Sequence, residues 1–158
     1  MTLDSIMTRH VVTVRMDTEL RDIRELFERY KFHHVVVTEH CKVVGIVSDR
    51  DLLKHISPFI GRASERSIDV DSLRRKAHQI MTRSLISARP DMRAGDAALM
   101  MINNRVSCLP VLDSNGACVG IVTIRDVLRW ALHQIADTSC EMRLSAANES
   151  CGDQSKAA

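Results

Sequence analysis

The sequence predicts an α/β fold in which one β-α-β-β-α unit occurs twice and the two copies form a single module. Residues 6–9 (Ile-Met-Thr-Arg) return 74 positions later as residues 80–83. Residues 45–51 return 75 positions later as residues 120–126, which fits a one-residue insertion in the loop around residues 113–116. In both copies, short β-branched runs alternate with apolar residues at helical spacing, the pattern of a mixed α/β fold. The duplication is the strongest signal in the chain.

The first copy contains each element of this unit in order. Apolar runs predict strands over residues 11–14, 35–37 and 43–47, and helices are expected over residues 18–30 and 49–55. The apolar positions of the first helix lie at helical spacing, and charged residues fill its other face: Leu20, Ile23, Leu26 and Phe27. The near-continuous apolar runs of the second and third strands are typical of strands buried on both faces.

The second copy repeats the order. Strands are predicted over residues 85–88, 109–112 and 119–122, with helices over residues 95–104 and from residue 124 to about 135. Asn115-Gly116 between the last two strands is a strong signal for a tight turn.

These assignments divide the chain into two repeats and a connector. The first domain is predicted over residues 1–56, a linker with a short helix over 57–79, the second domain over 80–137 and a polar tail over 138–158. Pro58, Gly61 and several serines mark the linker. The basic residues 74–76 are expected in a short helix running into Met81, as a solvated helix face rather than a nucleic-acid site.

Composition excludes several classes of protein. The 158 residues are 45% hydrophobic and 27% charged, as in a folded globular protein. A net charge of +2 supplies no general attraction to nucleic acid or anionic membranes, and five aromatic rings are too few for stacking platforms. The chain contains no apolar run of membrane-spanning length and no signal-peptide pattern, so a cytoplasmic location is expected. Five cysteines without a C-x-x-C pair predict neither disulfides nor a zinc site.

The two copies share the pattern Gly-apolar-apolar-Ser/Thr-x-Arg-Asp where a strand meets a helix. The simplest interpretation is a capping box, formed by Ser48 with Asp51 and by Thr123 with Asp126. Duplication alone does not contradict this interpretation, because a duplicated fold duplicates its caps.

A cap does not explain the whole pattern, since it requires neither Arg50 and Arg125 nor Gly45 and Gly120. Together these residues suggest an anion and sugar site. Helix N–H groups, a hydroxyl and a guanidinium can bind phosphate, while the carboxylate can accept hydrogen bonds from both hydroxyls of a ribose.

These motifs resemble a tandem pair of CBS domains, also called a Bateman module. Residues 109–113 (Leu-Pro-Val-Leu-Asp) with Gly116 and Gly120 resemble the family pattern closely, and the likeness extends over residues 5–130. The chain looks like a small stand-alone bacterial CBS-domain protein. The resemblance implies CBS units packed with approximate twofold symmetry, and it implies binding of AMP, ADP, ATP or S-adenosylmethionine in clefts between them.

The resemblance also assigns roles to individual residues. It implies ribose contacts for Asp51 and Asp126, and phosphate contacts for Arg50 and Arg125. The hydroxyls expected to bind ribose or phosphate are those of Ser48 and Thr123. The residues expected to face the nucleotide before the second strand of each copy are His33, His34, Ser107 and Cys108. The residues expected to bracket adenine are Val12 and Ile86.

The first copy departs from the family pattern. Residues 35–36 are Val-Val in place of Leu-Pro, and residues 38–42 lack the usual Asp and Gly. The backbone near adenine is therefore expected to differ there, and the site around Asp126 is favoured.

Other chemistries have little support in the sequence. His33 and His34 directly precede a predicted strand, and adjacent residues in extended chain point to opposite faces, so with His40 they predict no metal site. If one of them contacts the ligand's anion, affinity should fall as pH rises through about 6.5. Cys108 and Cys118 lie in apolar strands as core residues, and no nucleotide-hydrolysis or protease motif is present. The chain is therefore not expected to be an enzyme.

We expect a regulatory module that senses an adenosine nucleotide and acts on an unidentified partner protein. The family implies a homodimer through the helices that follow the last strand of each repeat. Its apolar surface is expected to include Leu52, Leu53, Val127 and Leu128. The alternatives are a dimeric assembly protein that has lost ligand binding, an S-adenosylmethionine-binding protein, and a nucleic-acid-associated regulator that uses residues 74–76.

Overall fold

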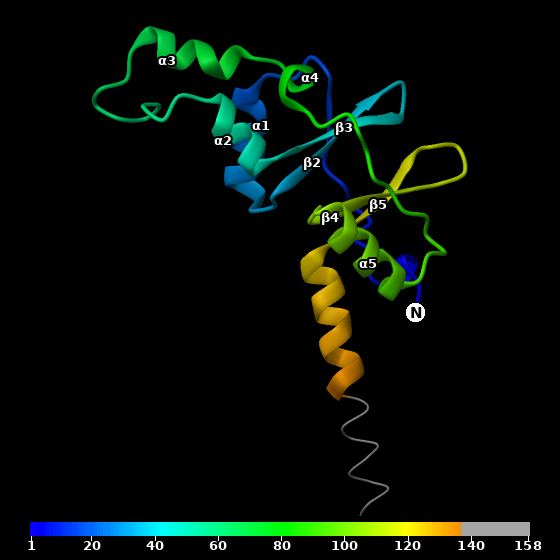
Figure 1. Ribbon diagram of the computed structural model, residues 1–158. Coiled ribbons are helices and arrows are strands. Elements are labelled where there is room, and N and C mark those ends of the chain that lie inside the picture. The colour runs from blue at the N-terminus through cyan, green and yellow to red at the C-terminus, as the bar shows by residue number, and fades with distance from the viewer. Residues whose placement is uncertain (137–158) are drawn as a thin grey trace, which may run out of the picture.

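The computed structural model describes residues 1–136, and its first repeat has the predicted order of elements (Figure 1). The bounds are a 3₁₀ turn η1 (Leu3–Ser5), β1 (Thr13–Arg15), α1 (Leu20–Tyr30), β2 (His34–Glu39), β3 (Lys42–Ser48) and α2 (Asp49–His55). β1 is parallel to β2, and β2 is antiparallel to β3. The chain between β2 and β3 turns at His40 and Cys41, whose φ angles are 48° and 63°. This two-residue turn connects the two strands in the first repeat, as the turn containing Asn115-Gly116 does in the second.

The connector and second repeat follow. Their bounds are α3 (Ser67–Asp71), η2 (Ser72–Arg74), α4 (Ala77–Ile80), α5 (Ala94–Asn104), β4 (Cys108–Leu112), β5 (Cys118–Thr123) and a last helix over residues 124–136. The polar tail predicted from residue 138 lies outside the described residues. No helix within residues 1–136 is long and apolar enough to cross a membrane.

The strand predicted over residues 85–88 is reduced to a single bridge between Ala88 and Val111. In the first repeat, the N–H of Val36 donates to the carbonyl of Val12 at 3.4 Å. The corresponding residue of β4 is Pro110, which has no N–H to donate. The second sheet therefore has two full strands, β4 and β5.

Each repeat is completed by a segment that precedes the other. Leu3 and Met7, at the start of the chain, are buried in the core of the second repeat. Ala77, Ile80 and Met81, which follow the connector, are buried in the core of the first. The repeated Ile-Met-Thr-Arg segment therefore joins the two repeats, a role that its sequence did not indicate.

Backbone bridges hold these exchanged segments in matching positions. Thr8 and Ile121 exchange N–H···O bonds of 2.9 and 3.0 Å, while Thr82 and Ile46 exchange bonds of 2.9 and 3.1 Å. We call the segments of residues 6–8 and 80–82, with their bridges, the clasp. A third apolar cluster between the repeats contains Val36, Cys108 and Ile121.

The clasp explains the two glycines of the shared motif. A Cβ atom built on Gly120 would lie 2.5 Å from Met7 Sδ, and one on Gly45 would overlap Met81 Sδ in the same way. A larger residue at either position would force the methionine that crosses the sheet of the other repeat to shift. Their recurrence is a packing requirement of the clasp, not evidence for an anion site.

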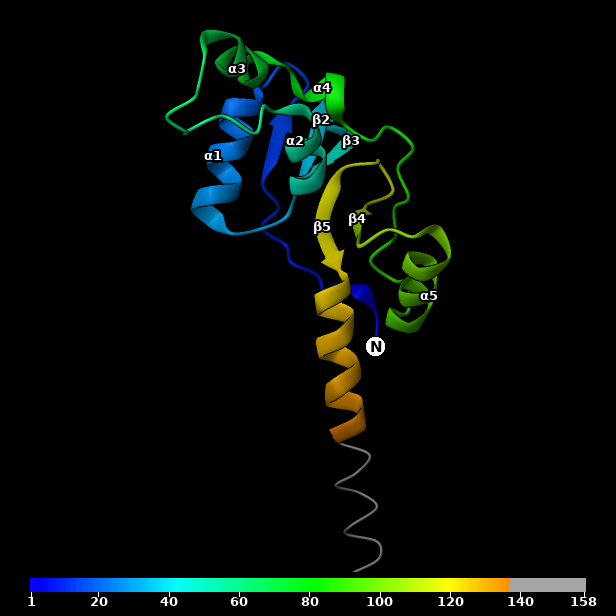
Figure 2. The ribbon, with the colours of Figure 1, turned by 60° about the vertical axis from the view of Figure 1, so that its left-hand side comes forward.

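The predicted apolar dimer surface is wrong at two of its four residues. Leu52 and Val127 are only 4% and 6% exposed, whereas Leu53 and Leu128 are exposed. Neighbouring helix positions point in different directions, so the two members of each pair cannot share one face. The last helix extends away from the two sheets (Figure 2).

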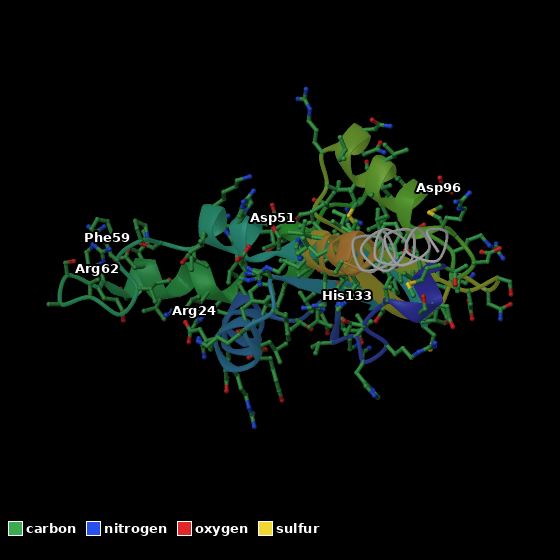
Figure 3. The ribbon with its side chains drawn as sticks, turned by 90° about the horizontal axis from the view of Figure 1, so that it is seen from below. Arg24, Asp51, Phe59, Arg62, Asp96 and His133 are labelled. Atoms are coloured by element: carbon green, nitrogen blue, oxygen red, sulfur yellow. The ribbon has the colours of Figure 1, made fainter. Side chains whose placement is uncertain are left out.

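The basic residues 74–76 do not share one helix. Arg74 is the last residue of η2, and residues 75–76 connect η2 to α4, which begins at Ala77. The backbone carbonyl of Arg75 accepts from Leu20, which holds this stretch against the start of α1. The connector loop carrying Phe59 and Arg62 lies at the opposite end of the molecule from Asp96 on α5 (Figure 3).

Candidate ligand-binding site

A cleft of about 650 Å³ lies between the repeats and is lined by residues of both. The exchanged segments contribute Thr8 and Thr82 to its walls. Ten of the twelve residues singled out from the sequence line it: His33, His34, Ser48, Arg50, Ile86, Ser107, Cys108, Thr123, Arg125 and Asp126. The structure therefore brings residues of both repeats to one shared cavity.

The two remaining residues lie elsewhere. Val12 packs against the core of the first repeat, and Asp51 is absent from the cleft wall although Asp126 is part of it. The two motifs are therefore alike in sequence but unequal in their access to the cleft.

Both motifs form the local bonds expected of a helix start. The Ser48 hydroxyl donates to Asp51 Oδ2 at 2.6 Å, and the Thr123 hydroxyl donates to Asp126 Oδ2 at 2.7 Å. The backbone N–H groups of Ser48 and Thr123 donate to the same oxygens at 3.0 and 2.9 Å. In return, the N–H of Asp51 donates to the Ser48 hydroxyl at 3.2 Å. The capping role is thus real, and it fixes where each carboxylate points.

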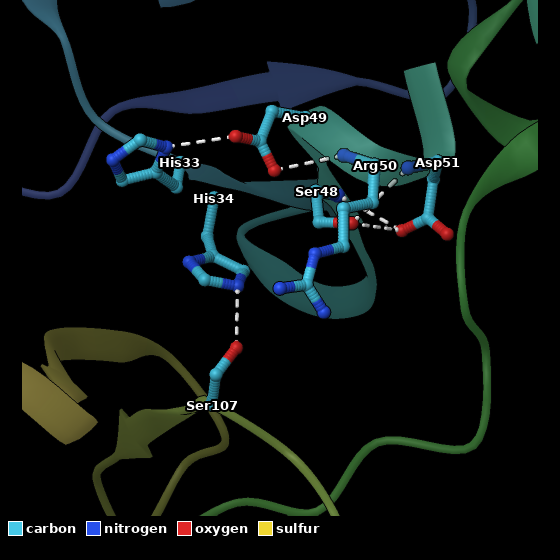
Figure 4. Close-up of polar contacts among 7 residues, drawn as sticks. All are labelled: His33, His34, Ser48, Asp49, Arg50, Asp51 and Ser107. Atoms are coloured by element: carbon cyan, nitrogen blue, oxygen red, sulfur yellow. Dashed lines mark hydrogen bonds and ion pairs between the residues drawn. The ribbon is translucent and has the colours of Figure 1, made fainter. Parts of the chain in front are cut away.

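The two histidines have different partners (Figure 4). His33 Nδ1 lies 2.8 Å from Asp49 Oδ2, an ion pair when the ring is protonated. His34 Nε2 lies 3.1 Å from the Ser107 hydroxyl and so connects the two repeats across the cleft. The positions that match His33 and Asp49 in the second repeat are Ser107 and Ile124, which form no such pair. Within residues 1–136, no three His, Cys, Asp or Glu side chains form a group able to hold a metal ion.

Burial controls the protonation of two residues on the cleft wall. Loss of hydration lowers the pKa of His34 below 6.5, and the Asp49 carboxylate opposes this shift. His34 therefore gains its proton at a lower pH than a fully hydrated histidine does. Burial raises the pKa of the Cys108 thiol to about 12, so this cysteine is a protonated, unreactive wall residue.

The sequence interpretation missed two cationic residues of the cleft wall, Lys31 and Arg105. They are the C-cap residues that directly follow α1 and α5, and they have left-handed φ angles of 57° and 55°. Lys31 and Arg105 are 74 positions apart, so the offset of the repeat would have shown that they correspond.

Comparison with known proteins identifies the family. The family model described as CBS domain matches residues 3–58 and 77–133. Protein MJ1426 of Methanocaldococcus jannaschii is 32% identical over 151 residues, covering 81% of this chain and 89% of its own.

Two solved structures have the same fold. CBSX2 in complex with AMP has a TM-score of 0.69 at 28% identity, covering 84% of this chain and 96% of its own. The CBS domain pair of protein MJ0100, in complex with methylthioadenosine and S-adenosylmethionine, has a TM-score of 0.71 at 23% identity, covering 85% and 98%. With its two matched repeats, this chain belongs to the CBS domain family and folds as a CBS domain pair.

Proposed function

We propose that this protein is a non-catalytic regulatory module that binds an adenosine nucleotide between its repeats and signals the bound state to a partner protein. The observation that carries the proposal is that ten of the twelve residues expected to contact an adenosine nucleotide, drawn from both repeats, line one cleft. CBSX2, which is similar over most of its length, binds AMP.

The second repeat offers the more complete half of the site. Asp126 Oδ2 accepts bonds from Thr123, and Arg129 lies 3.4 Å from Oδ1. A carboxylate has about four acceptor positions, so capacity remains for ribose hydroxyls. Ile86 and Val106 supply apolar wall for a base, and Arg125 supplies a guanidinium for phosphate.

Regulation would follow from the position of the cleft. A ligand there contacts both repeats as well as the clasp residues Thr8 and Thr82. It would therefore favour whichever arrangement of the two repeats it binds more tightly. The His34–Ser107 bond, which spans the same space, is the contact that such a ligand would strengthen or displace.

We further propose a homodimer through the exposed apolar side chains of the helices. Leu128 and Leu132 lie one turn apart on the last helix, and each is 59% exposed. Leu53 on α2 and Leu99 and Ile102 on α5 are exposed as well. Burying such side chains between two copies is the ordinary way to remove them from water.

The nucleic-acid alternative is disfavoured by the local ion pairs of residues 74–76. Lys76 Nζ lies 3.0 Å from Glu19, and Arg74 lies 3.5 Å from Asp71. Two of these three cations are therefore already neutralised by neighbouring carboxylates.

Calorimetric titration with AMP, ADP, ATP and S-adenosylmethionine tests the proposal. Losing one charge-assisted bond costs about 1.5–3 kcal/mol, so Asp126→Asn should weaken nucleotide binding about tenfold to a hundredfold. Asp51→Asn is the matched control, because Asp51 makes the same capping bonds outside the cleft wall. Undetectable binding of every ligand would leave an assembly protein as the better description. Equal affinity of parent and Asp126→Asn would refute the role proposed for Asp126 in binding the nucleotide.

A further inference from the structure

Four basic side chains line the cleft, as two pairs related by the repeat. Arg50 and Arg125 belong to the shared motif, while Lys31 and Arg105 are the C-cap residues of the helices α1 and α5. All four are exposed. The cleft therefore carries matching cations on its two halves, although the chain as a whole has a net charge of only +2.

None of these four cations has an ion-pair partner among residues 1–136. Elsewhere in that part of the chain, eight other arginine and lysine side chains each lie within 4.0 Å of a carboxylate. The cleft wall includes two carboxylates, and both are already bonded within the protein. Asp49 pairs with His33 and accepts from the Arg50 N–H, while Asp126 accepts from Thr123 and pairs with Arg129. The wall thus carries two more positive than negative side chains.

Helix capping alone does not explain Lys31 and Arg105. A cation near a helix C-terminus is favoured by the helix dipole, which is the simplest account of a basic residue there. The left-handed backbone at both positions, however, favours glycine or asparagine over a residue with a long side chain. A basic residue stands at both sites despite that preference, and both side chains reach the same cleft.

We propose that Lys31 and Arg105 recognise a phosphate chain, so that the ligand is an adenosine nucleotide with two or three phosphates rather than AMP or a sulfonium compound. The inference rests on the proposed function and specifies its ligand. Several unpaired cations around one cleft favour a ligand with several negative charges. The positively charged sulfonium of S-adenosylmethionine gains nothing from these cations, and uncharged adenosine gains little.

The test is a titration of adenosine, AMP, ADP, ATP, S-adenosylmethionine and sodium pyrophosphate against four proteins. These are the parent, Lys31→Gln, Arg105→Gln and Lys42→Gln. Lys42 is exposed on β3 away from the cleft wall, so its variant loses the same charge without changing the site. Thermal unfolding of each variant establishes that the fold is retained.

Affinity should rise from adenosine through AMP to ADP and ATP. Removing Lys31 or Arg105 should weaken ADP and ATP about tenfold while leaving adenosine unchanged, because only the phosphates lose a partner. Lys42→Gln should bind like the parent. Raising the salt concentration should reduce the advantage of ADP over adenosine, since the cations are exposed.

The possible failures are distinguishable. AMP, adenosine or S-adenosylmethionine binding as tightly as ADP would overturn this inference and leave the proposed function standing, as would both variants keeping the full preference for ADP. Pyrophosphate binding as tightly as ADP would support the phosphate site but refute adenosine recognition. Absence of binding by any compound would overturn both.

Discussion

Replacing Gly120 by alanine tests the clasp most directly. The added Cβ would lie 2.5 Å from Met7 Sδ and 2.9 Å from its Cγ, both far closer than normal carbon–sulfur or carbon–carbon contact. Met7 is 9% exposed and enclosed by the core of the second repeat, so it has little space to withdraw. Overpacking of this kind costs about 1–3 kcal/mol. For a chain of this size, each kcal/mol lowers the unfolding midpoint by about 2–4 °C.

A double-mutant cycle with Met7→Ala identifies the cause. Met7→Ala alone should cost about 2–5 kcal/mol, because it removes buried methylenes and leaves a cavity. In that background the methyl group added at position 120 has space, so Gly120→Ala should then cost little. The two substitutions should therefore differ from additivity by about 1–3 kcal/mol in urea unfolding.

Gly95→Ala is the control, because a Cβ at Gly95 meets no atom within 4 Å. Gly95 lies in the first turn of α5, where alanine should be neutral or stabilising by up to about 1 kcal/mol. Additive effects of Met7→Ala and Gly120→Ala, or equal destabilisation by Gly95→Ala, would refute the clasp as the reason for this glycine.

Two further predictions concern pH and assembly. Burial lowers the pKa of His34, so the unfolded chain binds a proton at this residue more tightly than the fold does. The contribution of His34 to the free energy of unfolding should then be constant above about pH 6.5 and fall as pH drops below it. In urea unfolding from pH 5 to 8, His34→Gln should therefore reduce the dependence of stability on pH. An unchanged dependence would contradict the lowered pKa of His34. The double variant Leu128→Glu with Leu132→Glu should be a monomer by light scattering where the parent is a dimer. Leu53→Glu, on α2, tests whether the first repeat contributes to the same interface. A parent that is monomeric at micromolar concentration would contradict the dimer.

The sequence predicted most of the fold because its signals were local. The helices α1 and α5 and the paired strands of each repeat followed from the spacing of apolar residues. The strand at residues 85–88 failed because Pro110 removes the donor that pairs its equivalent in the first repeat, an effect visible only once the register is known.

The exchange of the clasp segments between repeats could not be read from the sequence. Leu3 and Met7 directly precede the first repeat in the sequence. They nevertheless pack against α5, β4 and β5, whose residues are more than 80 positions further along the chain. The local pattern of apolar residues is the same whether this segment packs on the second repeat or on the neighbouring sheet of the first. The glycines were consequently attributed to an anion site, whereas Lys31 and Arg105 carried no motif and were overlooked.

The position of the clasp bears on how a bound ligand would act. Thr8 and Thr82 form the bridges that hold the repeats together, and both also line the cleft. A ligand in that cleft would therefore contact the residues whose backbone bridges determine the relative orientation of the two repeats. A ligand that binds only the folded module also stabilises it by about 2.7 kcal/mol at one hundred times its Kd, comparable with the cost expected for Gly120→Ala. Nucleotide should consequently restore much of the stability that this substitution removes.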